Sequence, residues 1–204
     1  MPSFLSSLVT IVSYYTLDTP YEEEVKHLKA SCEEFGISHH IEGVKNLGSW
    51  ERNCAFKPFF LRKMLSKFQK PIFWVDADAV FLQEPNFDPF LENDICVYRD
   101  AIEDIRFKVR SGSIFINATS SSFRVIDDWC RQAEQSKTRE HPPAFFDQIT
   151  LLHILENEGV AQIGALPLSY CKIYDFQSGQ ISKEDIVIEH YQASRKFHDF
   201  YLRK

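Results

Sequence analysis

The chain has 204 residues, of which 44% are hydrophobic and 25% are charged, and its formal net charge is -6. These values are ordinary for a globular protein, so we expect a single domain over residues 1–204. The acidic balance argues against a nucleic-acid partner, because proteins that bind nucleic acids usually carry a basic stripe. The negative net charge is compatible with a nucleotide ligand, because a metal ion can neutralise the charge of a diphosphate.

The five cysteines include no CxxC pair. An odd number without paired spacing argues against a disulfide scaffold and a zinc site, and free thiols are typical of a reducing compartment. The apolar stretch 4–15 lacks the preceding basic residue of a signal peptide, and no stretch is long enough to span a bilayer. We therefore predict a cytoplasmic protein.

The first half of the chain alternates between strand and helix patterns. Runs of β-branched and aromatic residues predict strands, and apolar residues every three or four positions predict helices. Strand, helix, strand, helix, strand predicts an α/β fold with a Rossmann-like, mostly parallel sheet. The predicted strands cover 8–14, 37–41 and 71–75, and the last is expected to be buried on both faces. The predicted helices begin at Thr19, which would form a capping box with Glu22, and near Pro58.

The second half continues with further strands and two helices. We predict strands over 94–99, 113–117, 160–166 and 186–190, helices over 121–135 and up to Gly159, and a loop over 169–183.

Two acids follow the most apolar predicted strand directly. Asp76 and Asp78 flank Ala77 at the carboxyl end of 71–75, where open parallel sheets bind ligands. Two carboxylates so close repel each other unless a cation or a proton is shared, and Mn²⁺ and Mg²⁺ prefer oxygen ligands. The alternative is a solvated turn that carries two aspartates. The apolar residues 79–82 disfavour it, because a loop tip would be polar on both sides.

The sequence Asp76-Ala77-Asp78 after an apolar strand resembles the DxD motif of GT-A nucleotide-sugar transferases. The resemblance implies the GT-A fold, in which helices flank the central sheet and a small mixed second sheet is added. It also implies a glycosyltransferase that uses Mn²⁺ or Mg²⁺ and a UDP- or GDP-sugar donor. The acceptor would be a carbohydrate, a lipid or a protein. The other segments that follow the family's order are 57–59, 111–117, 146–148 and 188–191.

The resemblance assigns roles around the metal. His190, at the end of an apolar strand, is implied as the third metal ligand; a core histidine is the alternative, and His198 is a second candidate ligand. Lys57, beside a predicted helix start, suits phosphate binding. Asp147, next to Gln148, is implied to lie beside the transferred sugar as a general base or an orienting group; a favourable charge at a helix start is the alternative.

The remaining candidates would contact the rest of the donor. Gly112 would let a sugar pack against backbone, or would form a β-bulge. Ser13 and Tyr14 would meet the nucleotide base, unless Tyr14 is a core residue. Lys196 would bind the diphosphate, and the basic, aromatic C-terminal tail could also touch an anionic membrane; a frayed tail is the alternative.

Three other functions remain open from the sequence. A haloacid-dehalogenase-like phosphatase would use Asp76 as its nucleophile, but no downstream Gly-Asp metal motif is present. A sugar nucleotidyltransferase would need a Gly-rich loop after the first strand, where 13–16 has no glycine. An inactive relative that only binds a nucleotide sugar is the non-enzyme alternative.

Overall fold

The computed structural model describes residues 8–137, 146–176 and 179–195, and within them the chain forms two sheets. The central sheet has six strands in the order β2-β1-β3-β6-β5-β7. Strand β6 runs antiparallel to both of its neighbours, and the other pairings are parallel. The strands of this sheet are β1 (Thr10–Thr16), β2 (His39–Val44), β3 (Ile72–Val75), β5 (Ile95–Arg99), β6 (Val109–Ile116) and β7 (Ile163–Ala165).

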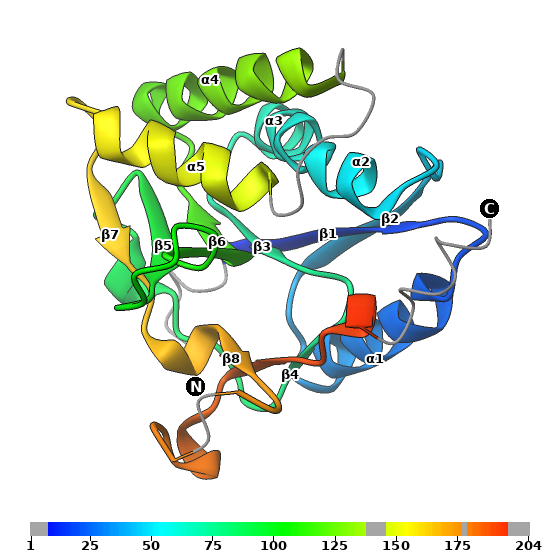
Figure 1. Cartoon of the computed structure of the whole chain (residues 1–204). Coiled ribbons are helices and arrows are strands. Elements are labelled where there is room, and N and C mark those ends of the chain that lie inside the picture. The colour runs from blue at the N-terminus through cyan, green and yellow to red at the C-terminus, as the bar shows by residue number, and fades with distance from the viewer. Residues whose placement is uncertain (1–7, 138–145, 177–178, 196–204) are drawn as a thin grey trace.

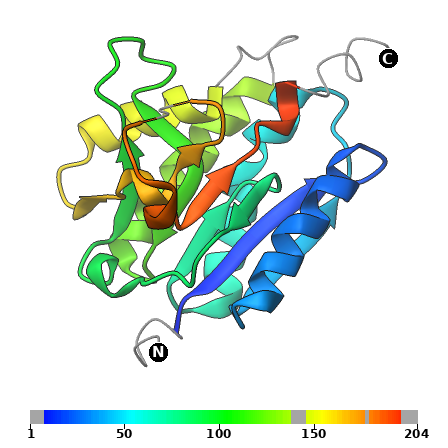
Figure 2. The same cartoon turned by 90° about the horizontal axis from the view of Figure 1, so that it is seen from below.

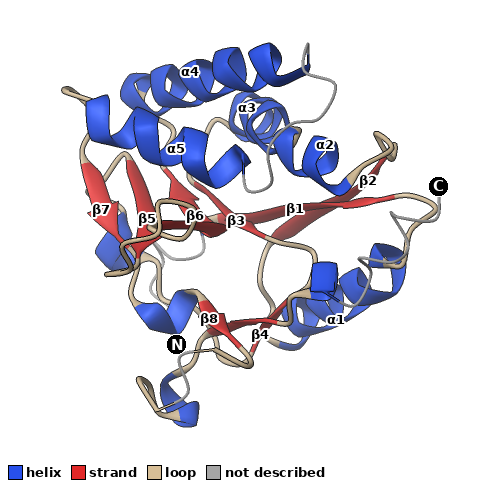
Figure 3. Ribbon diagram, viewed as in Figure 1, coloured by secondary structure: helices blue, strands red, loops and turns tan. Residues whose placement is uncertain are grey.

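The helices cover the central sheet unequally. In Figures 1 and 3, α2, α3, α4 and α5 lie on one face of the sheet, and α1 with the second sheet lies on the other. The predicted α/β fold with a mostly parallel sheet is therefore confirmed. The helices are α1 (Tyr21–Glu34), α2 (Trp50–Ala55), α3 (Lys57–Phe68), α4 (Ser120–Lys137) and α5 (Phe146–Asn157).

Strand β3 lies in the middle of the core, and each of its residues is buried. Its side chains alternate between two apolar clusters, as strand geometry requires. Ile72 and Trp74 join the cluster under α3, α4 and α5, and Phe73 and Val75 join the cluster on the side of α1. A strand apolar on both faces is what the continuous run predicted.

The second sheet is small and mixed, as the resemblance implied. Its order is β4-β9-β8, where β9 runs antiparallel to β4 and parallel to β8. Figure 2 shows β9 beside β4 and α1 on the other side of β4. The chain passes from β3 in the first sheet to β4 in the second through residues 76–78, so the acid pair lies at the crossing. The strands are β4 (Ala79–Phe81), β8 (Lys172–Ile173) and β9 (Ile188–His190).

Some local predictions were wrong. Helix α2 was not predicted, because six residues are too few to show a helical period; Ser49 caps it by accepting from the Arg52 amide. The stretch 169–183, predicted as a loop, contains β8 and is bordered by two 3₁₀ turns, Leu168–Tyr170 and Lys183–Asp185. Thr19 precedes α1 rather than forming a reciprocal capping box: its hydroxyl accepts from the Tyr21 amide, and the Glu22 carboxylate accepts from the Asp18 amide.

None of the helices in the described residues combines the length and apolar character needed to cross a bilayer.

Candidate active site

The acid pair is tied to both sheets. The Asp76 amide donates to the Gly112 carbonyl at 2.9 Å, which extends the β3–β6 pairing by one residue. The Asp78 carbonyl accepts from the Tyr191 amide at 3.1 Å, and its carboxylate Oδ2 accepts from the Ala193 amide at 2.7 Å. Asp76 is held by β6 of the first sheet, and Asp78 is held by the backbone that directly follows β9 of the second sheet. The turn between the two acids is therefore fixed at both ends.

His190 brings a third metal-binding group to the acids. Asp76, Asp78 and His190 each offer one ligand atom, and these atoms lie within 4.8 Å of one another. The Nε2 atom of His190 lies 2.9 Å from the Ser113 hydroxyl, which orients the ring from the side of β6. Two carboxylates and one imidazole form a donor set that suits Mn²⁺ and also Mg²⁺. The residues present therefore fit the metal site that the resemblance implied.

Burial sets the protonation of this cluster. Burial and the neighbouring Asp76 raise the pKa of Asp78 to about 7, and burial lowers the pKa of His190 to about 4. His190 is therefore neutral at pH 7 and able to bind a metal through a ring nitrogen, whereas Asp78 must lose a proton to become a ligand.

We expect Mn²⁺ affinity to fall roughly tenfold for each pH unit below about 7 and to level off above it, because a proton competes for Asp78. Calorimetric titration of the protein with Mn²⁺ between about pH 5.5 and 8.5 measures this slope and the proton release that accompanies binding. The low pKa of His190 keeps that residue from adding a second step in this range. An affinity that does not change with pH would contradict the assignment of Asp78 as a ligand.

Lys57 is the first residue of α3 and is buried next to the acids. Its Nζ donates to the Ser111 carbonyl at 3.0 Å, the Ser111 hydroxyl at 2.9 Å and Asp147 Oδ2 at 3.0 Å. Asp76 Oδ1 lies 3.2 Å from the same atom. Burial alone would lower the pKa of Lys57, but Asp76 and Asp147 outweigh it and hold the pKa above its usual value. The ammonium is thus charged and shared between two carboxylates.

Asp147 and Gln148, at the start of α5, are both anchored to Ser111. Asp147 Oδ2 accepts from the Ser111 hydroxyl at 2.7 Å as well as from Lys57. Gln148 Oε1 accepts from the Ser111 amide at 3.1 Å, and its Nε2 donates to the Arg106 carbonyl at 2.9 Å. Asp147 is buried.

Sequence reasoning missed three residues that position the site. Trp74 donates its indole N–H to Asp76 Oδ1 at 3.1 Å, and Lys57 Nζ lies 5.3 Å from its ring centre. Ser111 and Ser113 hold Asp147 and His190. Trp74 stands two residues before Asp76, but no general sequence signal shows that its indole reaches the acid. Both serines lie in the segment 111–117, but nothing in the sequence assigned either a role.

Gly112 lies against the metal cluster. A Cβ at this position would lie 3.0 Å from Cε1 and 3.2 Å from Nδ1 of His190, and 3.3 Å from Asp76 Oδ2. The pairing of β5 with β6 also shifts here: Val97 pairs with Ile114, and the next residue, Tyr98, pairs with Arg110. The bulge that the sequence left open is therefore present, and the missing side chain makes room for two metal ligands.

Replacing Gly112 with alanine is expected to weaken Mn²⁺ binding roughly 10- to 100-fold, because the new methyl group displaces His190 and Asp76. The backbone at Gly112 lies outside the left-handed region, so alanine adds no backbone strain. Gly159→Ala is the matched control, since a Cβ there meets nothing within 4 Å. Equal Mn²⁺ affinity for both variants would contradict the prediction.

The residues predicted to contact the nucleotide base are buried. Ser13 is fully buried, and its hydroxyl has no hydrogen-bond partner in the described residues. Tyr14 is a core residue, which was the alternative to contact with the base. Its ring packs on Phe60, and its hydroxyl donates to the Asn53 carbonyl at 2.6 Å. Their contact with a nucleotide base stays a prediction. Lys196 and His198 lie outside the described residues.

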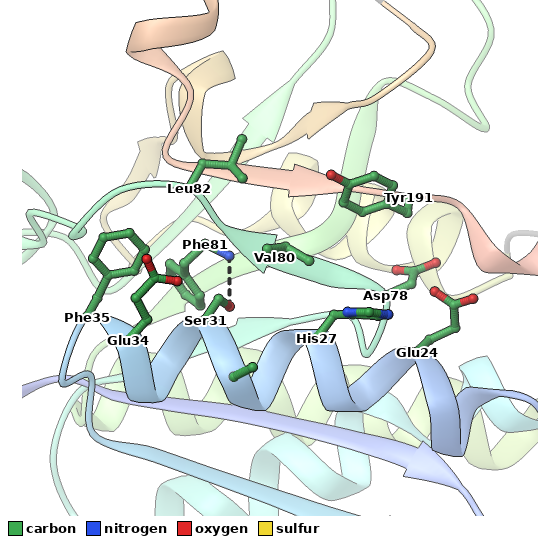
Figure 4. A pocket seen from close by; sticks show the side chains of 11 residues that line it. Glu24, His27, Ser31, Glu34, Phe35, Asp78, Val80, Phe81, Leu82 and Tyr191 are labelled. Atoms are coloured by element: carbon green, nitrogen blue, oxygen red, sulfur yellow. Dashed lines mark hydrogen bonds between the residues drawn. The ribbon is translucent and has the colours of Figure 1, made fainter.

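A groove of about 610 Å³ runs between α1 and β4 (Figure 4). Glu24, Asp78 and Tyr191 lie together at one end of it, and Phe35 and Leu82 lie at the other. Its volume is in the usual range for small-molecule sites. Of the three residues of the candidate metal site, Asp78 alone lines this groove.

Comparisons with known proteins agree with this geometry. A family model described as nucleotide-diphospho-sugar transferase matches residues 15–201. Among solved structures, the chain is similar to a glycosyltransferase involved in the glycosylation of the major capsid of PBCV-1. The TM-score is 0.71 at 13% identity, over 96% of this chain and 99% of that one.

The chain is also similar to the glycosyltransferase GlyE of Streptococcus pneumoniae TIGR4, with a TM-score of 0.56 at 15% identity. That match covers 89% of this chain and 54% of GlyE, so the chain spans about half of GlyE's length. At these identities the likeness concerns the fold alone. No curated protein sequence matches the chain significantly.

Proposed function

Because the chain belongs to the nucleotide-diphospho-sugar transferase family and is a glycosyltransferase, we propose that Asp76, Asp78 and His190 hold Mn²⁺ or Mg²⁺ for a UDP- or GDP-sugar donor. The observation that carries this proposal is the convergence of the three side chains from two sheets. A metal bound there supplies a Lewis acid for the leaving nucleoside diphosphate. The sugar would move to a hydroxyl of a carbohydrate, lipid or protein acceptor.

Lys57 supports the site by positioning other groups. An ammonium has three N–H donors, and the two contacts to Ser111 and the one to Asp147 use all three. We therefore place Lys57 as a positioning residue that keeps Asp147 and Asp76 in place, in preference to a direct phosphate ligand. Its Nζ lies 3.2 Å from Asp76 Oδ1, so a phosphate bound at the acid pair would still be close to its charge.

Asp147 is placed to act on a hydroxyl group. Both hydrogen bonds described for its carboxylate fall on Oδ2, from Lys57 and from Ser111. We propose that Oδ1 receives a hydroxyl of the sugar or of the acceptor, which Asp147 orients or deprotonates. Gln148, fixed between Ser111 and Arg106, holds the start of α5 next to β6 and so supports the position of Asp147.

Calorimetry with UDP and GDP tests the proposal. We expect at least one of them to bind roughly tenfold or more tightly with Mn²⁺ than with a chelator, because the ion bridges protein and diphosphate. A panel of UDP- and GDP-sugars should then reveal a donor that is hydrolysed only with metal. Metal-independent nucleotide binding would contradict the role of the acid pair. Metal-dependent binding without any turnover would favour the inactive relative.

A further inference from the structure

Three aromatic side chains lie on the segments that directly follow β8 and β9. We name Tyr174, Phe176 and Tyr191 the aromatic rim. Tyr174 is 45% exposed and Phe176 is 41% exposed. The rings of Tyr174 and Tyr191 are stacked, with centres 5.7 Å apart and planes at 17°. Clustered exposed aromatic rings are uncommon on a monomer unless they bind something.

The backbone of the rim is fixed by several contacts. The Tyr174 amide donates to the His190 carbonyl at 3.1 Å, which ties the segment to β9. The buried Lys172 ammonium donates to the Phe176 carbonyl at 2.6 Å and to the Ile173 carbonyl. These contacts fix the backbone that carries Tyr174 and Phe176, whose rings remain exposed although burying them would be favourable by itself. Ordered exposure of this kind points to a binding surface.

The rim borders the reaction centre on two sides. Tyr191 lies together with Asp78 at one end of the groove between α1 and β4. At the other end, the Arg110 guanidinium lies 5.6 Å from the centre of the Phe176 ring. Arg110 precedes Ser111, which holds both Lys57 and Asp147. A molecule lying on the rim therefore has one edge near the metal ligands and another near the strand that anchors Asp147.

We propose that the aromatic rim binds the acceptor and that this acceptor is a carbohydrate; the proposal rests on the proposed function. A pyranose presents a flat face of C–H groups that packs on an aromatic ring, and its hydroxyls need hydrogen-bond partners around that ring. The rim supplies both features. Arg110 and Arg195 flank it and are paired with Asp100 and Asp175. Each guanidinium has five N–H donors, so it can bind a hydroxyl while paired.

The chemistry of the rim favours a sugar over the other acceptors. A lipid chain would need a continuous aliphatic groove, whereas the rim consists of flat rings next to ion pairs. An extended peptide would need a free sheet edge, and a proline-rich peptide would need an aromatic-lined groove, whereas the rim is a set of rings beside ion pairs. Flat aromatic surface with convergent polar groups at its border is the arrangement expected for a small amphipathic ring.

The test separates sugar binding from catalysis. Simple methyl glycosides are titrated into the protein and followed by saturation-transfer NMR, which needs no turnover. With an active donor, transfer to the same glycosides, to a Ser/Thr-containing peptide and to a detergent-solubilised polyprenol is measured beside donor hydrolysis. We expect a glycoside to bind and to accept the sugar.

Tyr174→Ala is expected to raise KM for the glycoside roughly tenfold while leaving donor hydrolysis unchanged, because only the stacking surface is lost. Tyr174→Phe keeps the ring and should behave as the parent protein. Val160→Ala, a change at a 70% exposed residue, is the control for loss of an exposed apolar side chain.

Transfer only to the peptide or the polyprenol, or an unchanged KM in Tyr174→Ala, would overturn the proposal. If no donor is hydrolysed but glycosides bind and Tyr174→Ala weakens that binding, the proposed function fails and the rim stands as a sugar-binding surface. If glycosides neither bind nor accept the sugar, and no sugar is transferred to any acceptor, both the proposed function and the proposed role of the rim are refuted.

Discussion

Replacing Asp78 with asparagine is expected to lower sugar transfer roughly 10³-fold or more, since one charged metal ligand is lost. The same change is expected to stabilise the metal-free protein at high pH. The pKa of Asp78 is about 7 in the folded protein, above its unfolded value of about 3.9. An acid whose pKa is raised on folding destabilises the folded state increasingly as pH rises from its unfolded pKa to its folded pKa. Asparagine removes this penalty, and its amide oxygen can still accept from the Ala193 amide.

The gain in stability should depend on pH. At about 1.4 kcal/mol per unit of pKa shift, the penalty reaches a few kcal/mol above pH 7 and is much smaller near pH 5. Thermal unfolding with a chelator at both pH values measures the difference. Asp127→Asn, the same chemical change at an exposed residue of α4 paired with Arg62, is the control. An Asp78→Asn variant that transfers sugar normally, or that is destabilised equally at both pH values, would refute the assignment.

Breaking the buried pair between Lys57 and Asp147 is expected to cost ~3–5 kcal/mol of stability, because a charge is left buried without its partner. We expect Lys57→Met to be the more harmful single change, since Lys57 also lies 3.2 Å from Asp76. The double variant Lys57→Met with Asp147→Leu should recover part of the loss, because neither charge then remains unpaired.

Activity should not follow stability in this series. All three variants are expected to lose transfer roughly 10²- to 10⁴-fold, because Asp147 or its positioning is removed. Denaturant unfolding of the single and double variants gives the coupling free energy, and initial rates with an active donor give the activity. Strictly additive stability losses would show that the pair is not coupled. Recovery of activity in the double variant would exclude a catalytic role for Asp147.

Local patterns made much of the scaffold predictable. The apolar run of β3 predicted a strand buried on both faces, and the acids after it pointed to the sheet edge where Asp76, Asp78 and His190 converge. The alternation of patterns also predicted the order of the main strands and helices. The short α2 has too few residues to show a period, and the two-residue strand β8 depends on pairing with β9. Such elements are set by tertiary contacts and leave little local signal.

The site was predictable in parts for the same reason. Asp76 and Asp78 are neighbours in sequence, and His190 came from the family resemblance. The contacts of Lys57 with Ser111 and Asp147 join residues 54 and 90 positions apart, so no spacing rule could pair them. Tyr14 shows a further limit. Nearly every residue of β1 is buried, so alternation could not tell which side chains enter the core.

The position of β9 has a consequence for protein synthesis. This strand contributes His190 and inserts between β4 and β8, yet it is the last strand of the described chain. During translation the central sheet can assemble while the smaller sheet still lacks its middle strand. A nascent or truncated chain that stops before Ile188 leaves β4 without a neighbour in its sheet and lacks the imidazole. The proposed metal site is therefore complete only once the ribosome has released the chain as far as His190.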